Sequence, residues 1–82
     1  MDLERAIEIA AAAHRRQTDK AGQPYILHPL RVMLACEGQA AQIAAVLHDV
    51  IEDTDWTPEA LRAEGASDEI LAALYTVTRR DD

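Results

Sequence analysis

The segment from Ala40 to Asp53 constrains the fold more than any other part of the chain. Its apolar residues recur at three- and four-residue intervals, which predicts a helix with one buried face. Its last six residues include four ionisable ones, and on a helix His48 faces Glu52 while Asp49 faces Asp53. Like charges at that spacing destabilise a helix unless a positive charge lies beside them. The segment therefore favours a core helix whose end binds a cation.

The composition favours an all-α fold. The chain has 82 residues, 16 of them alanine, with no phenylalanine and few valines or threonines to build a sheet. A chain of this length forms one small domain, residues 1–82, and buries only roughly 60% of its unfolded surface. We expect about five helices: from Leu3 to His14 behind the cap Asp2, from the His28-Pro29 junction to the cap Gly38, from Ala40 to Glu52, from Pro58 behind the cap Thr57 to a point before Gly65, and from Ser67 through Ile70, Leu71, Leu74 and Val77.

The net charge of −7 argues against a nucleic-acid partner, because a phosphate backbone needs a basic surface. Four of the eight basic residues nevertheless gather in one region: Arg15, Arg16, Lys20 and Arg31. Lys20 lies in a predicted loop, Gln17 to Pro24, that is rich in turn formers. This region indicates a site for a small polyanionic ligand, or, as the alternative, only solvated surfaces of opposite charge.

The single cysteine and the apolar runs indicate the compartment. Cys36 has no second cysteine in the chain to pair with, so a reducing compartment is expected. No apolar run approaches the roughly 20 residues of a membrane span, and the start of the chain lacks the basic residues of a signal peptide. We therefore expect a cytoplasmic protein with no membrane partner.

A second histidine is a candidate ligand for the same cation. His28 precedes Pro29 at a rigid junction, so its side chain points in a fixed direction. With His48 and Asp49 it forms a mixed imidazole and carboxylate set that suits Mn, Fe or Zn rather than Ca. Three ligands leave positions for water and substrate, and Glu52 is placed to accept the proton of that water while Asp53 orients it.

Two long ungapped motifs carry a family resemblance. The first is Lys20-Ala21-Gly22-Gln23-Pro24-Tyr25-Ile26-Leu27-His28-Pro29-Leu30, preceded by Ala13-His14 and Gln17, and the second is Leu47-His48-Asp49-Val50-Ile51-Glu52-Asp53-Thr54. Matches at Thr57, Leu61, Gly65 and Val77-Thr78 extend over nearly the whole chain. With these motifs the sequence resembles the HD-domain phosphohydrolases, and more closely the ppGpp hydrolase domains of Rel/Spo homologues and the small alarmone hydrolases.

The resemblance implies roles for the site residues. His28, His48 and Asp49 match positions that bind manganese in that family, and Glu52 and Asp53 match those that handle the attacking water. The expected cofactor is therefore Mn²⁺, or another divalent transition metal, and the expected fold is an HD-domain-like helical bundle.

The resemblance also implies a nucleotide polyphosphate as the partner. Lys20 matches a position near the nucleotide, and the family has an arginine just before it that holds the guanine base. Here that position is Asp19, which leaves Arg15 and Arg16 as the candidates to replace the arginine.

The length of the chain differs from that of the family. Family members are about twice as long and have a further aspartate ligand on a later helix, which Asp81 and Asp82 come too early to match. The chain is therefore expected to correspond to the N-terminal half of the domain and to form a homodimer. The leading hypothesis is a Mn²⁺-dependent ppGpp 3′-pyrophosphohydrolase. The alternatives are a non-catalytic helical module that self-associates or binds nucleotide, and a structural metal site without catalysis.

Overall fold

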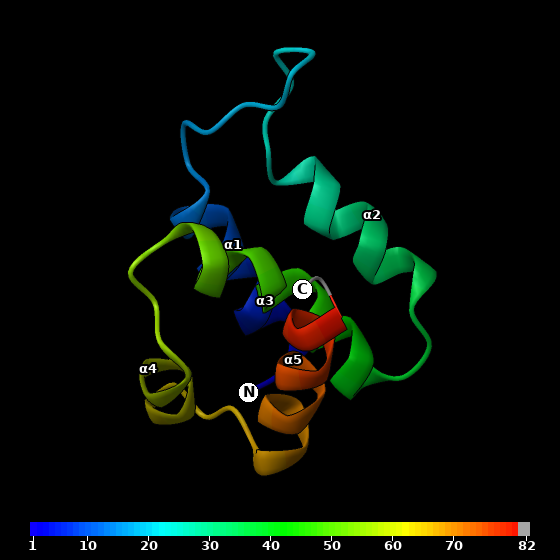
Figure 1. Ribbon diagram of the computed structural model, residues 1–82, viewed down its shortest axis with the longest axis vertical. Coiled ribbons are helices and arrows are strands. Elements are labelled where there is room, and N and C mark those ends of the chain that lie inside the picture. Colours follow the sequence, from blue (N-terminus) through cyan, green and yellow to red (C-terminus); the bar gives the residue numbers. More distant parts are fainter. Residues whose placement is uncertain (81–82) are drawn as a thin grey trace.

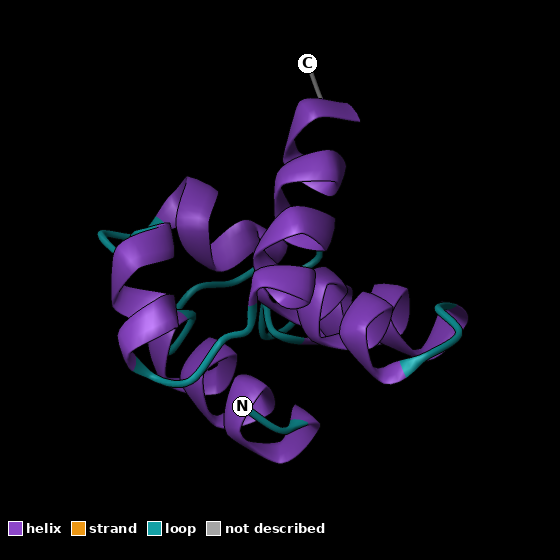
Figure 2. Cartoon of the chain, turned by 90° about the horizontal axis from the view of Figure 1, so that it is seen from below, coloured by secondary structure: helices purple, strands orange, loops and turns teal. Residues whose placement is uncertain are grey.

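The computed structural model describes the backbone of residues 1–80 and the side chains of residues 1–75. Within residues 1–80 it contains five helices and no strand, so the predicted all-α fold is confirmed. Figure 2 shows the helices joined by loops, with the last helix projecting from the rest.

The central helix is α3 (Gln39–Asp53), which contacts α1, α2 and α5. Figure 1 shows it between the other helices. Its buried residues lie around much of its circumference, which is typical of a helix at the centre of a bundle. They are Ile43, Ala44, Ala45, Val46, Leu47, Asp49 and Val50. The core packs around α3 as far as Val50, so it positions the end of the helix that bears the ionisable residues.

The first helix is α1 (Leu3–Ala13), and it begins where the sequence predicts. The Asp2 side chain accepts a hydrogen bond from the backbone N–H of Arg5 at 2.8 Å, which satisfies one of the unpaired donors of the first turn. Ala6, Ile9 and Ala10 are buried, and the small alanine side chains let α1 approach the core closely. His14 follows the last turn and is buried as well.

The second helix, α2 (Leu27–Ala35), differs from the prediction at both ends. It begins one residue before His28, so His28 and the buried Pro29 both lie in its first turn. It ends before Cys36, whose backbone is extended. Gly38, with φ of 91°, forms the N-cap of α3 instead of the end of α2. The predicted cap is therefore wrong in its role, because a glycine in the left-handed region also suits a turn into a new helix.

The last two helices have the predicted caps. α4 (Pro58–Ala63) follows Thr57, whose hydroxyl accepts a hydrogen bond from Ala60 N at 3.1 Å. α5 (Asp68–Arg80) follows Ser67, whose hydroxyl accepts one from Ile70 N at 3.2 Å. Leu61, Ile70 and Leu74 are buried in the core. The side chain of Val77 and the residues Asp81 and Asp82 lie outside the described part of the chain.

The segment between α1 and α2 is a loop, as predicted. A single bridge joins Thr18 to Pro24, and one oxygen of Asp19 accepts hydrogen bonds from Ala21 N and Gln23 N, each at 2.9 Å. Arg16 has φ of 73° and is the one residue other than glycine with a positive φ in the described backbone. Such a conformation is unfavourable for a residue with a side chain, so the backbone is strained where it enters this loop.

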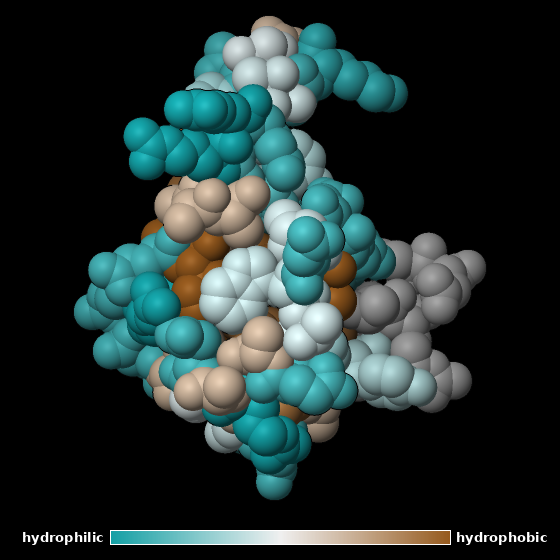
Figure 3. All heavy atoms as spheres, turned by 90° about the vertical axis from the view of Figure 1, so that its left-hand side faces the viewer, coloured by the Kyte–Doolittle hydropathy of each residue, from teal (hydrophilic) through white to brown (hydrophobic). Residues whose placement is uncertain are grey.

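The surface reflects the small size of the domain. Figure 3 shows hydrophobic side chains reaching the surface in the middle of one face, enclosed by hydrophilic ones. A chain of this length has too little interior to bury all its apolar side chains. None of the described helices combines the length and apolar character needed to cross a membrane.

Candidate metal and catalytic site

The end of α3 brings together the predicted ligands His48 and Asp49. Their side chains are only 15% and 12% exposed, and His48 Nδ1 lies 3.2 Å from Asp49 Oδ1. One turn further along, Glu52 Oε1 lies 3.6 Å from His48 Nε2, and its side chain is more open to solvent. The i, i+4 proximity expected of His48 and Glu52 is therefore present.

The first turn of α2 brings His28 to the same place. His28 Nε2 lies 3.8 Å from Asp49 Oδ2, although the two residues come from different helices. Asp49 thus lies between the two histidines, with one carboxylate oxygen toward each. The His28 side chain is 56% exposed, so this side of the site is open to a ligand from solvent.

A hydroxyl group also reaches Asp49. Tyr25, in the loop before α2, donates a hydrogen bond from its hydroxyl to Asp49 Oδ2 at 2.8 Å. Burial raises the pKa of the Tyr25 hydroxyl, and the hydrogen bond to Asp49 and the charges of Asp49, Asp53 and Glu52 raise it further. Tyr25 therefore remains a hydrogen-bond donor at neutral pH.

The donor set fits a divalent transition metal. Within the described residues, ligand atoms of His48, Asp49 and Glu52 all lie within 4.8 Å of one another. Imidazole and carboxylate groups together suit Mn, Fe or Zn. His28 lies outside this group of three but within reach of Asp49, so Glu52 competes with His28 for the role of third ligand. Asp53, the last residue of α3, is exposed and contributes negative charge near Tyr25.

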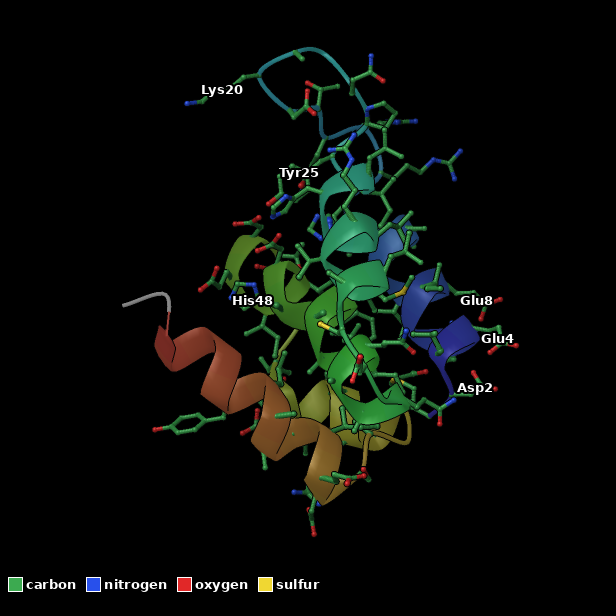
Figure 4. The ribbon with its side chains drawn as sticks, turned by 90° about the vertical axis from the view of Figure 1, so that its right-hand side faces the viewer. Asp2, Glu4, Glu8, Lys20, Tyr25 and His48 are labelled. Carbon is green, nitrogen blue, oxygen red and sulfur yellow. The ribbon has the colours of Figure 1, made fainter. Side chains whose placement is uncertain are left out.

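The predicted substrate-binding residues lie between the end of α1 and the tip of the loop. Arg15, Arg16 and Lys20 are exposed. Figure 4 shows Lys20 at the outer tip of the loop, with Tyr25 between it and His48 in that view. Beside Lys20, one carboxylate oxygen of Asp19 accepts the two backbone hydrogen bonds that close the loop. The roles of these cations in binding stay predictions.

Tyr25 is the site residue that sequence reasoning missed. It belongs to the motif around His28, yet its spacing from Asp49 in the sequence gives no sign of the hydrogen bond between them. The available signal was chemical: a tyrosine between apolar residues usually finds a partner for its hydroxyl when it is buried.

Residues 6–80 match the HD domain family. This match covers most of the chain, and the chain therefore belongs to the HD domain family, whose members are metal-dependent. His28, His48, Asp49, Glu52 and Asp53 all lie within the matched residues. The resemblance inferred from the two motifs is confirmed.

Several longer proteins contain a region similar to this chain. A protein of Mycobacterium leprae named probable GTP pyrophosphokinase is 42% identical over 83 residues, which cover 96% of this chain and 10% of that protein. A guanosine-3′,5′-bis(diphosphate) 3′-pyrophosphohydrolase of Borreliella burgdorferi is 39% identical over 82 residues, which cover 95% of this chain and 12% of that protein. A protein of the same name from Aquifex aeolicus is 43% identical over 65 residues, which cover 74% of this chain and 9% of that protein. The chain spans about a tenth of the length of these relatives.

Proposed function

We propose that this chain carries a Mn²⁺-dependent phosphohydrolase site that removes the 3′-pyrophosphate of guanosine-3′,5′-bis(diphosphate), ppGpp, or a related nucleotide. The observation that carries the proposal is the meeting of His28 from α2 with Asp49 and His48 from α3, beside Glu52. Similarity to proteins named as 3′-pyrophosphohydrolases supports it, at 39% and 43% identity.

His28, His48 and Asp49 hold the cation in this proposal. Two imidazoles beside one carboxylate favour Mn²⁺, Fe²⁺ or Zn²⁺ over Ca²⁺, which prefers an all-oxygen site. When bound, the cation supplies positive charge that acidifies water and offsets charge on the phosphoryl oxygens. The low exposure of His48 and Asp49 strengthens their interaction with that charge.

Glu52 and Asp53 serve the attacking water. Glu52 accepts the proton that the water loses, while Asp53 orients the water toward phosphorus. The water oxygen bonds to the phosphorus of the 3′ ester, and the bond from phosphorus to the ribose 3′ oxygen breaks. The ribose 3′ oxygen takes up a proton from solvent to become a hydroxyl, and pyrophosphate is released. The exposure of both carboxylates supports this role, because water and substrate must reach them.

The basic residues of the loop hold the substrate. Lys20, Arg15 and Arg16 bind the phosphates as exposed cations on an otherwise acidic protein. Their charges also draw a polyanion toward the open side of the site, beside His28.

The setting of the site is part of the same proposal. We place residues 1–82 in one HD-type domain that corresponds to the N-terminal half of the family's domain. A cytoplasmic location is supported by the single cysteine.

Self-association as a homodimer is supported by an apolar groove on α3, α4 and α5, lined by Ile51, Pro58, Leu71, Leu74 and Tyr75. Sedimentation velocity tests the dimer.

Pyrophosphate release from ppGpp in the presence of Mn²⁺ tests the function. We expect release by the unsubstituted protein and none by Glu52→Ala or Asp53→Ala. Glu59→Ala, which removes an exposed carboxylate from α4, is the matched control and should release pyrophosphate at the normal rate. Full activity in the Glu52 and Asp53 variants would contradict the proposed mechanism.

Glu52→Gln separates the two roles open to Glu52. If Glu52 is the base, this variant keeps Mn²⁺ affinity and loses turnover, because the amide keeps the shape of the side chain but accepts no proton at neutral pH. If Glu52 is a ligand, Mn²⁺ affinity falls as well. Metal uptake with unaltered nucleotide in every protein would favour a structural metal site, and absence of uptake would favour a non-catalytic module.

A further inference from the structure

Tyr25 contacts Asp49 in a way that determines the orientation of the carboxylate. The hydroxyl donates to Oδ2 at 2.8 Å, while Oδ1 lies 3.2 Å from His48 Nδ1. Each oxygen of this nearly buried group therefore has a different neighbour, and rotation of the carboxylate breaks both contacts at once. A carboxylate held in this way presents fixed lone pairs to a cation.

Tyr25 is itself held by the residues that follow α1. Its backbone N–H donates to the carbonyl of Gln17 at 2.8 Å, and its ring packs on that of His14 with a centroid distance of 4.9 Å. The His14 ring is only 2% exposed, and its Nδ1 lies 3.0 Å from Gln17 Oε1. Tyr25 is thus anchored through its main chain and through the tilted contact of its ring with His14, so its hydroxyl has little freedom to leave Asp49.

Tyr25 also borders the second histidine. The Tyr25 and His28 rings are 5.9 Å apart, and His28 Nε2 approaches the same oxygen, Asp49 Oδ2, that accepts the tyrosine hydroxyl. The tyrosine therefore lies against the contact between α2 and α3 on which the proposed metal centre depends.

We propose that Tyr25 is a positioning residue of the metal centre, which fixes the Asp49 carboxylate through its hydroxyl and is backed by His14 and Gln17. This inference rests on the proposed function, since it assumes that Asp49 binds a metal. A hydrogen-bonding partner of a ligand orients it and sets its strength as a donor, and loss of such a partner typically weakens metal binding about 10- to 100-fold. A tyrosine that served only as packing would act through its ring and not through its hydroxyl.

Tyr25→Phe tests the inference, because it removes the hydroxyl and keeps the ring. Calorimetric titration with Mn²⁺ measures the affinity, and the visible absorption of protein saturated with Co²⁺ reports the ligand geometry. We expect the variant to bind Mn²⁺ about 10- to 100-fold more weakly and to give an altered Co²⁺ spectrum. Loss of packing alone does not change the spectrum at saturation. Tyr75→Phe deletes the same atom from a tyrosine that is 62% exposed, and should leave both measurements unchanged.

A second variant keeps the test decisive if Tyr25→Phe folds poorly by circular dichroism. His14→Leu leaves the tyrosine hydroxyl in place and removes the polar ring behind it, and should bind Mn²⁺ more weakly than the unsubstituted protein does. Affinity and spectrum indistinguishable from those of the unsubstituted protein, in each of these variants that folds, overturn the role of Tyr25 and leave the proposed function standing. Failure of the unsubstituted protein to bind either metal overturns both.

Discussion

Asp49 is the residue on which the geometry of the site depends most. It is nearly buried, and an ionised carboxylate in such a place is costly unless polar groups satisfy it. Tyr25 and His48 supply those groups from two directions, and His28 approaches from a third. The sequence predicts Asp49 as a ligand from its place beside His48 on a core helix. It does not identify Tyr25 as the partner of Asp49, because contacts between distant segments depend on how the loop folds.

Arg16 offers a direct test of backbone strain. With φ of 73°, it occupies a region that glycine enters without a steric cost. We expect Arg16→Gly to raise the free energy of unfolding by about 1 kcal/mol, measured by urea denaturation. Arg15→Gly is the matched control, because it removes the same charge at a neighbouring position without a positive φ. Equal effects of the two substitutions would show that charge, and not the backbone, is responsible.

Tyr25 makes stability depend on pH in alkaline solution. Burial and the contact with Asp49 raise its pKa, so the folded state holds the phenolic proton more tightly than the unfolded chain does. This contribution to stability is complete below about pH 10 and is lost as the pH rises through the folded-state pKa.

Absorbance of tyrosinate measures this effect in a Tyr75→Phe background, where Tyr25 is the one tyrosine left. We expect ionisation of the folded protein at a higher pH than that of the same protein in urea. Urea midpoints should fall as the pH rises above about 10, and the fall should be smaller when Tyr25 is also replaced by phenylalanine. Coincident titration of the folded and unfolded protein would contradict the raised pKa.

At the scale of elements, the sequence predicts helices best where a cap and an apolar pattern agree. Asp2, Thr57 and Ser67 all cap the helices expected of them, because capping depends only on residues within one turn. The ends of α2 were predicted less well. A glycine such as Gly38 suits either the C-terminal cap of one helix or the N-cap of the next. Only tertiary packing decides which of these two roles it takes.

The short helix α4 should depend on its cap. It has six residues, too few to be stable alone, and Thr57 satisfies one of its free N–H groups. We expect Thr57→Ala to lower the free energy of unfolding by about 1 kcal/mol. Thr57→Ser keeps the hydroxyl and should restore most of that loss. Thermal denaturation monitored by circular dichroism gives both values, and an equal loss in the serine variant would argue against a capping role.

At the scale of the molecule, the site joins parts of the fold that the sequence alone does not place together. His48 and Asp49 follow from the pattern of α3, whereas the approach of His28 to Asp49 requires α2 to pack on α3. The chemistry of the side chains alone makes His28 a candidate ligand beside His48 and Asp49, but no spacing in the sequence shows that α2 brings it there. The family resemblance gives the same three residues, because it relates whole motifs and not single spacings.

A cation bound between α2 and α3 should stabilise the whole bundle. Anything that binds the folded state and not the unfolded chain adds to stability by mass action, which at a free Mn²⁺ concentration of 100 times the Kd is about 2.7 kcal/mol. For a domain of this size we expect a rise in Tm of roughly 10 to 20 °C. Differential scanning calorimetry with Mn²⁺, and again after chelation, measures the rise and its reversal.

The identity of the ligands is tested in the same experiment. His48→Ala should abolish the shift in Tm, because its side chain lies between Asp49 and Glu52 and is largely buried. Asp55→Ala, which removes an exposed carboxylate beyond the end of α3, should keep the full shift. Ca²⁺ should shift the Tm less than Mn²⁺, because imidazole ligands suit transition metals better. A shift that survives in His48→Ala would place the bound metal elsewhere in the molecule.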